Sequence, residues 1–321
     1  MTRQLAGVVV TYYPDLQRLE ATLARLGPEL TPLVVVDNSD DPDVARAVES
    51  CCREAGALLL AMKSNIGIAA AQNRGIRESL QCNATHVLFL DDDSELTAGA
   101  PTALLVAFDS LRVTRPNVVA MGPMVKDRRT GEFLTFAWRG RHIRQLRTAD
   151  DHDDFTDSAF LLGSGAVVLA EAFETVGLFR EEYFIDHVDK EWGLRAGASG
   201  FTSVVTSSVT LLHSLGDTPV RDASGSAALY THRSPVRDYY LTRNAFLLFR
   251  DLDLPRIRFV GMFRLLAEQS VRKVVHPAHP GQRRAVLRGV ADGLRGRSGP
   301  LGRTVTGKVG VERSPTRRGA S

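Results

Sequence analysis

The segment of residues 86–94 constrains the fold more than any other part of the chain. It reads HVLFLDDDS, so an apolar run leads directly into three carboxylates. A run that is apolar on both faces is typical of an interior strand in a covered parallel sheet, and such sheets bind ligands beyond the carboxyl ends of their strands. Adjacent carboxylates repel one another unless a cation or solvent balances them, and their hard oxygens suit Mg2+ or Mn2+ with a diphosphate as co-ligand. The alternative is an acidic turn in which Asp93 or Ser94 caps the next helix.

The size and composition of the chain indicate a folded protein of one large or two modest domains. It has 321 residues, of which 44% are hydrophobic, enough to bury a substantial core. No apolar stretch approaches the roughly 20 residues that span a bilayer, and no secretory signal is evident, so we expect a cytoplasmic protein. Cys51, Cys52 and Cys82 are odd in number and lack zinc-site spacing, which favours reduced thiols.

Charge is divided unequally along the chain. Residues 1–250 hold 25 Lys and Arg against 32 Asp and Glu, whereas residues 251–321 hold 15 against 5. Residues 256–275 mix apolar and basic side chains in an amphipathic pattern that is compatible with an anionic membrane surface; the alternative is a helix that packs on the body. From Gly296 onward the composition predicts a disordered basic tail. Because the body is acidic, nucleic acid is a poor candidate partner.

The first part of the chain alternates apolar runs with amphipathic stretches. Such alternation predicts an α/β fold whose parallel strands are joined by right-handed crossovers. The expected strands cover residues 5–12, 33–36, 57–62 and 87–90, and the expected helices cover residues 16–26, 43–55 and a stretch that follows residues 65–69 and runs to Leu80.

Each expected strand ends in polar residues that are able to contact a ligand. Thr11 and Tyr13 follow the first strand, Asp37 the second, Asn65 the third, and the three carboxylates the fourth. Neighbouring strand ends line one crevice, where Asp37 can accept a hydrogen bond from the imide N–H of uracil or thymine and Tyr13 offers a stacking face. A helix cap for the stretch beginning at Asp43 is the alternative role for Asp37.

Two further clusters carry chemistry. Asp189 and Glu191 lie near the start of an expected helix, where the positive helix end would keep a carboxylate ionised for use as a general base. A capping pair with an ion pair to Arg195 is the alternative. In residues 233–244, a second expected helix places Arg237 and Arg243 near one face, where guanidinium groups suit a diphosphate; an ordinary solvated face is the alternative.

A series of motifs follows one another along this chain. They are VVTYYP at 9–14, VVDNS at 35–39, NIGIAAAQNRG at 65–75, FLDDDS at 89–94, GSG at 163–165, VGLF at 176–179 and FIDHVDKEW at 184–192. In this order they resemble the family 2 glycosyltransferases and, within them, bacterial rhamnosyltransferases. The resemblance covers roughly residues 5–250. The chain departs from the rhamnosyltransferase pattern at Tyr13, Asp92 and His187, where Asn, Gln and Tyr respectively are common.

The resemblance implies a GT-A fold, with a Rossmann-like nucleotide-sugar-binding half at residues 1–95 and an acceptor-binding half at residues 96–250. A basic helical extension at residues 251–296 and a tail at residues 297–321 would follow. The implied donor ligands are Thr11, Tyr13, Asp37, Asn65, Asn73, Asp91 and Asp92; the implied metal ligands are Asp91, Asp93 and His213; Asp189 is the implied base; and the acceptor or diphosphate contacts are Ser164, Gly165, Glu191, Trp192, Arg237 and Arg243.

The sequence therefore predicts an inverting, metal-dependent glycosyltransferase. The expected donor is dTDP-L-rhamnose, the expected cofactor is Mg2+ or Mn2+, and the expected acceptor is a polyprenyl-diphosphate-linked saccharide of cell-wall or surface polysaccharide synthesis. The acceptor would be met at the cytoplasmic membrane face, to which the basic C-terminal region would attach the enzyme peripherally. Two alternatives remain, namely transfer from a UDP-sugar such as UDP-galactofuranose, and a non-catalytic sugar-nucleotide or glycan-binding protein.

Overall fold

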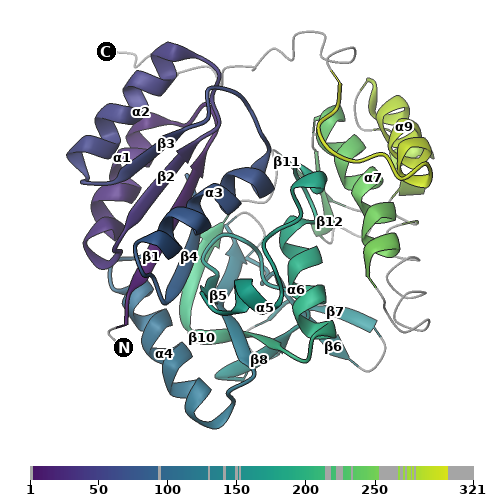
Figure 1. Cartoon of the computed structure of the whole chain (residues 1–321). Helices are drawn as coiled ribbons and strands as arrows, with labels where there is room; N and C mark the ends of the chain where they lie inside the picture. Colours follow the sequence, from purple (N-terminus) through teal and green to yellow (C-terminus); the bar gives the residue numbers. More distant parts are fainter. Residues whose placement is uncertain are drawn as a thin grey trace, which may run out of the picture.

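The structure is a computed structural model of the whole chain (Figure 1). It describes residues 3–92, 95–128, 131–139, 142–148, 151, 153–213, 218–221, 227–232, 234–252, 267, 270–271, 273–275, 277 and 280–302. The predicted metal ligand Asp93, the side chain of His213, most of the amphipathic segment 256–275 and the tail after residue 302 lie outside the described residues.

The first half of the chain forms the parallel part of the main sheet, as predicted. Four parallel strands pair in the order β3-β2-β1-β4. Because β4 returns to the other side of β1, the crevice between these two strands is a topological switch point, where open α/β sheets bind ligands. The elements in chain order are β1 (Leu5–Thr11), α1 (Leu16–Leu26), η1 (Gly27–Glu29), β2 (Leu33–Asp37), α2 (Pro42–Glu54), β3 (Leu58–Ala61), α3 (Ile68–Gln81) and β4 (His86–Asp91).

The positions at which the helices start rule out the two capping roles considered above, one for Asp37 and one for Asp93 or Ser94. The carboxylate of Asp41 caps α2 by accepting a 2.8 Å hydrogen bond from the Asp43 N–H, so Asp37 is left for another role. The helix after β4 begins only at Ala100 and has Gly99 as its N-cap, so Asp93 and Ser94 do not cap it.

The second half extends the sheet by four strands in the order β9-β5-β10-β8. Strand β9 is antiparallel to both β4 and β5, β10 is parallel to β5, and β8 is antiparallel to β10. The elements are α4 (Ala100–Thr114), β5 (Val118–Asp127), β6 (Thr135–Arg139), β7 (His142–Leu146), β8 (Phe155–Ser158), β9 (Val167–Leu169), α5 (Ala172–Thr175), η3 (Glu181–Tyr183), α6 (Val188–Ala198), β10 (Thr202–His213), β11 (Thr218–Arg221), β12 (Ala227–His232), α7 (Pro235–Asp251) and α9 (Gln282–Leu294).

One continuous core joins the two halves, with buried side chains from every strand of the switch-point crevice and from α4, α6 and α7. The predicted boundary at residue 250 coincides with the end of α7, and α9 packs along this helix (Figure 1). A buried hydrogen bond of 3.0 Å between the Tyr239 hydroxyl and the Asp292 carboxylate joins α7 to α9. Among the described helices, none is both long enough and apolar enough to cross a membrane.

Candidate active site

Asp37 lies at the carboxyl end of β2, where one of its carboxylate oxygens accepts hydrogen bonds and the other does not. Its Oδ1 atom accepts hydrogen bonds from the Thr11 hydroxyl at 2.9 Å and from the Ser39 hydroxyl at 2.8 Å. Its Oδ2 atom is buried and has no hydrogen-bond partner within the described chain. A buried acceptor without a partner is costly, so this oxygen is suited to a donor supplied by a ligand.

Two exposed tyrosines stand beside this carboxylate. The rings of Tyr12 and Tyr13 meet edge to face, with their centroids 5.0 Å apart. Tyr13 has a left-handed backbone (φ 51°), and its N–H donates to the Ser39 hydroxyl at 2.9 Å. The Tyr13 hydroxyl donates to Asp40, and this bond raises the pKa of the phenol to about 12. Ser39 thus links the backbone of the exposed Tyr13 to the Asp37 carboxylate, and an exposed ring near a buried acceptor is an arrangement that suits a nucleoside.

The side chains of the two asparagines predicted as donor ligands are hydrogen-bonded to the backbone of this chain. The Asn65 side chain accepts a 2.9 Å hydrogen bond from the Gly67 N–H, which delays the start of α3 until Ile68. Asn73 is buried, and its amide both donates to the Phe179 carbonyl at 2.8 Å and accepts from the Phe179 N–H at 3.0 Å. Since both ends of the Asn73 amide are occupied by backbone, we assign this residue to the framework and not to the donor site.

Asp91 and Asp92 end β4 in half-buried positions. The Asp91 N–H lies 3.4 Å from the hydroxyl of Ser164, which is buried. The neighbouring Gly165 has φ +83°, and a Cβ atom at that position would approach Pro123 to 2.8 Å, so a larger residue would push the loop out of place. The GSG motif thus lies directly beside the carboxylate end of β4.

The backbone also brings the predicted metal ligands toward one place. Glu95, two residues after Asp93, pairs in an isolated bridge with Leu212, the residue before His213. Among the residues whose side chains are described, no group of three His, Cys, Asp or Glu could hold a metal ion. Asp91 is the predicted metal ligand whose side chain is described, and its carboxylate suits a hard divalent cation. The other two, Asp93 and the His213 side chain, lie outside the described set, and Asp92 was predicted as a donor contact.

Asp189 occupies the first turn of α6 and faces the GSG loop. Its Oδ2 atom accepts a 3.1 Å hydrogen bond from the Gly163 N–H, and its Oδ1 atom accepts one of 2.8 Å from the Lys190 N–H. Burial raises the pKa of Asp189, and this effect exceeds the lowering by the two N–H groups and by the Lys190 charge. The predicted influence of the helix end is therefore outweighed, and a raised pKa brings a carboxylate closer to that of a useful general base.

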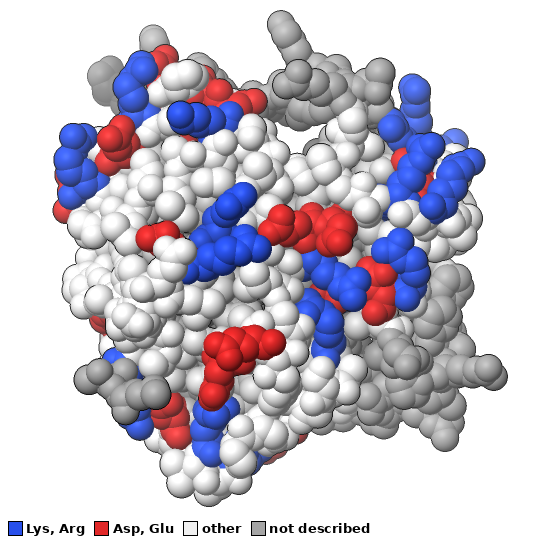
Figure 2. Space-filling model, viewed as in Figure 1, with Lys and Arg blue, Asp and Glu red and all other residues white. Residues whose placement is uncertain are grey.

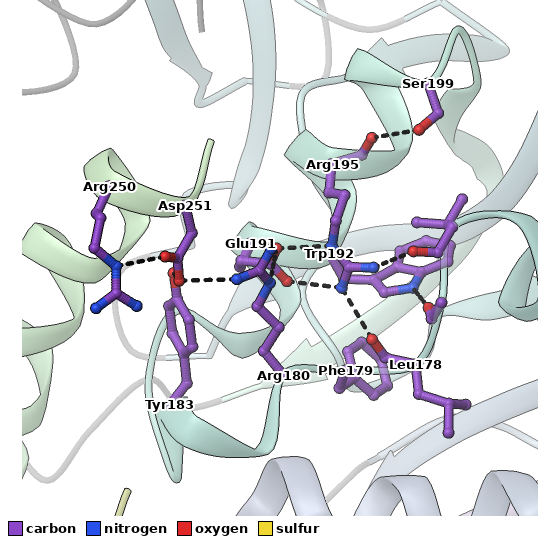
Figure 3. Close-up of polar contacts among 12 residues, drawn as sticks. Leu178, Phe179, Arg180, Tyr183, Glu191, Trp192, Arg195, Ser199, Arg250 and Asp251 are labelled. Carbon is purple, nitrogen blue, oxygen red and sulfur yellow. Dashed lines mark hydrogen bonds and ion pairs between the residues drawn. The ribbon is translucent and has the colours of Figure 1, made fainter. Parts of the chain in front are cut away.

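Glu191 and Trp192, predicted near the acceptor, are instead interior residues (Figure 3). The Glu191 carboxylate binds Arg195 through two hydrogen bonds of 2.7 and 2.9 Å and also pairs with Arg180 at 3.2 Å. Trp192 donates to the Gly177 carbonyl at 2.8 Å and packs among phenylalanines. The reason is periodicity: two residues along a helix turn the side chain by about 200°, so Asp189 and Glu191 point to opposite faces. The alternative of an ion pair with Arg195 is confirmed for Glu191.

The two arginines on the predicted diphosphate face of α7 are also bonded to other parts of the protein. Arg237 makes two 2.8 Å hydrogen bonds to the Asp186 carboxylate and remains partly exposed. Arg243 is only 1% exposed and donates to the carbonyls of Glu182 and Tyr183, at 3.1 Å each. Neither a solvated helix face nor an open diphosphate clamp describes Arg243, which we assign to the framework. Ser39 and Gly163 were missed as site residues, although Ser39 lies two residues after Asp37 and Gly163 directly before Ser164, within quoted motifs.

Comparison with known proteins identifies the family of the chain. A family model for glycosyl transferase family 2 matches residues 8–177. The chain is 32% identical over 259 residues to the dTDP-rhamnosyl transferase RfbF of Shigella flexneri, a match that covers 79% of this chain and 83% of that protein. It is 26% identical over 262 residues to an N-acetylglucosaminyl-diphospho-decaprenol L-rhamnosyltransferase of Mycobacterium tuberculosis, covering 73% and 83% of the two chains.

Solved structures share the fold at low sequence identity. Staphylococcus aureus TarS 1–349 in complex with UDP-GlcNAc matches with a TM-score of 0.54 and 14% identity, over 92% of this chain and 81% of that one. The mannosyltransferase PcManGT from Pyrobaculum calidifontis, in complex with GDP-Man and Mn2+, matches with a TM-score of 0.53 and 14% identity, over 92% and 88%. These neighbours are GT-A glycosyltransferases, which confirms the predicted fold class. The chain belongs to glycosyl transferase family 2 and is a glycosyltransferase of the GT-A fold.

Proposed function

We propose that this enzyme is an inverting, metal-dependent transferase that moves L-rhamnose from dTDP-L-rhamnose to a hydroxyl of a lipid-linked saccharide. The observation that carries the proposal is the GSG loop, where the Gly163 N–H binds Asp189 and the next residue, Ser164, lies against Asp91. One loop thus joins the proposed base to the proposed diphosphate end of the donor. The reacting bond would lie between these two carboxylates.

The transfer follows from general chemistry. The acceptor oxygen attacks the anomeric carbon as its proton passes to Asp189, and the bond between that carbon and the diphosphate oxygen breaks. A single displacement of this kind inverts the configuration at the anomeric carbon. A bound Mg2+ or Mn2+ would neutralise charge on the departing diphosphate. Asp91 and Asp92 supply described carboxylates for such an ion, with Asp93 and His213 as the further proposed ligands.

The proposed nucleoside site is the strand-end group of Thr11, Tyr13 and Asp37. The unpaired Asp37 Oδ2 would accept the imide N–H of the base, and the Tyr13 ring would stack on it. Thymine and uracil share this imide edge, so a UDP-sugar remains the alternative donor. The choice of dTDP-L-rhamnose is supported by the identity to the Shigella dTDP-rhamnosyl transferase, and the lipid-linked acceptor by the mycobacterial relative.

Peripheral attachment to an anionic membrane is supported by the outer face of α9. This face exposes Arg283, Arg284, Leu287, Leu294 and Arg295. Figure 2 shows blue side chains gathered over α9 at the right of the molecule. Exposed leucines among arginines suit the boundary between headgroups and acyl chains. The acceptor, if it is a polyprenyl diphosphate, lies in such a membrane.

The experiment compares dTDP-L-rhamnose with UDP-galactofuranose in the presence of Mg2+ or Mn2+, with release of the nucleoside diphosphate as the readout. We expect metal-dependent release from dTDP-L-rhamnose, which EDTA abolishes and added metal restores. Release from the UDP-sugar alone would overturn the donor assignment and leave the mechanism in place. Release from dTDP-L-rhamnose that is unaffected by EDTA would overturn the metal requirement. The product anomer, read by NMR, tests inversion.

A further inference from the structure

The backbone immediately before the proposed base adopts a rare conformation. Phe184, Asp186 and His187 all have left-handed φ angles, of 64°, 66° and 63°. At Phe184 the angles are φ 64° and ψ −62°, and the Ile185 N–H bonds back to the Tyr183 carbonyl at 2.8 Å. These are the features of a classic γ-turn, which is strained for a residue with a side chain. Such a loop persists only where surrounding contacts fix it.

Helix α7 supplies most of those contacts, through Asn244. The Asn244 side chain is fully buried, and its Nδ2 atom lies 2.8, 2.7 and 3.0 Å from the carbonyls of Tyr183, Ile185 and Asp186. Its Oδ1 atom accepts hydrogen bonds from Arg243 at 2.9 and 2.7 Å, which fixes the orientation of the amide. The donor end of Asn244 therefore points at the strained loop and nowhere else.

The remaining carbonyls of the loop are also bonded. Arg243 donates to the carbonyls of Glu182 and Tyr183, and the Ile68 N–H, at the start of α3, donates to the Phe184 carbonyl at 2.8 Å. Every carbonyl from residue 182 to residue 186 thus accepts a hydrogen bond from α7 or α3. At the outer edge, Arg237 grips the Asp186 side chain with two hydrogen bonds.

The loop leads directly into the helix that carries the base. His187 is the N-cap residue of α6, and its carbonyl accepts the first helical hydrogen bond, from the Glu191 N–H at 2.8 Å. Asp189 follows two residues later and meets the Gly163 N–H. The place where α6 begins therefore decides whether Asp189 reaches the GSG loop.

We propose that α7, through Asn244, Arg243 and Arg237, positions Asp189 for transfer by holding the carbonyls of residues 182–186. This inference rests on the proposed role of Asp189 as the base. Asn244 is a positioning residue, since it acts through the loop and not on the substrate. Like Asp189, these α7 side chains lie beyond residues 8–177, the part of the chain that the family model matches.

The decisive variant is Asn244→Asp, which keeps the shape and the acceptor for Arg243 but turns an oxygen toward three carbonyls. We expect kcat to fall about 100-fold, the effect of a misplacement near 1 Å. Binding of thymidine diphosphate, measured by calorimetry, should change little, because Thr11, Asp37 and Ser39 are not bonded to the loop. Loss of the Gly163 hydrogen bond should also move the acid limb of the kcat profile to higher pH. Asn244→Ala should act in the same direction.

Tyr239→Phe is the matched control, since it removes a buried hydrogen bond from α7 to α9 and keeps the ring that packs against Arg243. It should lower the melting temperature without changing kcat or its pH profile. If the Asn244 variants lower the melting temperature in the same way and keep wild-type kcat and pH profile, the proposal is overturned. If the Asn244 variants do not fold, Arg237→Lys is the deciding test. Lysine keeps the positive charge but cannot make the paired hydrogen bonds of the guanidinium to the Asp186 carboxylate. A lower kcat with a shifted acid limb supports positioning, and wild-type behaviour overturns it.

Asp189→Asn is measured alongside, so that two kinds of failure can be told apart. Full activity of Asp189→Asn would refute the proposed base itself. An inactive Asp189→Asn beside fully active Asn244 variants would refute only the positioning role. The charged groups that face Asp189 are Lys190 and Asp186, and neither is altered in these variants.

Discussion

The proposed donor ligands Thr11, Asp37 and Asp91 are the last residues of the apolar strands β1, β2 and β4. Asp189, in contrast, follows a loop that is hydrogen-bonded to a distant part of the chain. Thr11 and Asp37 need only their own strands and one neighbouring hydroxyl to reach their positions. The loop before Asp189 depends on Asn244, which lies 58 to 61 residues further along the sequence. We therefore expect donor binding to depend on the strand ends and the positioning of Asp189 to depend on long-range contacts. The predictions below test this division.

The largest effect is expected from Asp189→Asn. Without a carboxylate to take the proton, transfer should fall by about 10²–10⁴-fold, the range typical of a lost general base. Donor binding should persist, because the strand-end ligands are untouched. The measurement is nucleoside diphosphate release at saturating donor, together with nucleotide affinity. Loss of both together would show that the two regions are not separable.

Breaking the buried ion pair on the other face of α6 should damage stability. Glu191→Ala leaves Arg195 without its carboxylate partner and leaves Arg180 with Asp251 alone of its two carboxylates. We expect the free energy of unfolding to fall by about 3 kcal/mol, the lower end for a broken buried pair because Arg180 reaches solvent. Urea unfolding measures it. The control is Arg46→Ala, whose partner Asp43 is highly exposed, and its loss should be near zero. Equal losses in both variants would contradict the structural role given to Glu191.

The local part of this comparison could be predicted from the sequence. Strands β1 to β4 and helices α1 and α2 were predicted within one or two residues, because apolar runs and helical periodicity are properties of neighbouring residues. Helix α3 starts at Ile68, two residues before the predicted start after Ala69, and the Asn65 side chain holds the Gly67 N–H just outside the helix. The polar ends of β1 and β2 meet as predicted for the same reason: parallel strands align their carboxyl ends.

The long-range part could not be predicted in this way. Glu191, Trp192 and Arg243 were expected to face ligands and are buried, because the choice of their partners depends on how α6 and α7 pack. The sequence spacing of Asp189 and Glu191 did contain a usable signal, since residues two apart in a helix cannot share a face. The backbone contacts of Asn244 contain no such signal, because carbonyls of any residue type serve equally.

A smaller effect is expected at the strand-end site. Asp37→Asn keeps the shape of the side chain, replaces one acceptor oxygen by an N–H donor, and removes the negative charge. Affinity for thymidine diphosphate should fall by about 10- to 150-fold, equivalent to a charged hydrogen bond of about 1.5–3 kcal/mol. Calorimetric titration measures it. Ser50→Ala on the exposed face of α2 serves as control. An unchanged affinity would show that the unpaired Asp37 oxygen does not meet the nucleobase.

The pH dependence of transfer should reveal the raised pKa of Asp189. A base must be deprotonated to act, so kcat should fall about tenfold per pH unit once the pH drops below that pKa. Because burial raises the pKa of Asp189, the fall should begin above the pH at which an ordinary aspartate protonates. The residual rate of Asp189→Asn should lack this limb. If the pH profile of Asp189→Asn shows an acid limb at the same pH as the wild type, that limb belongs to another titrating group.

The smallest effect concerns the region furthest from the chemistry, the exposed face of α9. Arg284→Ser removes one positive charge, which near an anionic surface contributes about 1 kcal/mol, or about fivefold in partitioning. Sedimentation with vesicles of anionic lipid at low salt measures this change, and high salt should erase it. Arg46→Ser, an exposed arginine on α2, is the matched control. If both variants lose binding equally, net charge alone attracts the protein. If only Arg284→Ser does, α9 faces the membrane, and because α9 packs on α7, the helix that holds the base loop would also set the distance between Asp189 and the lipid-borne acceptor.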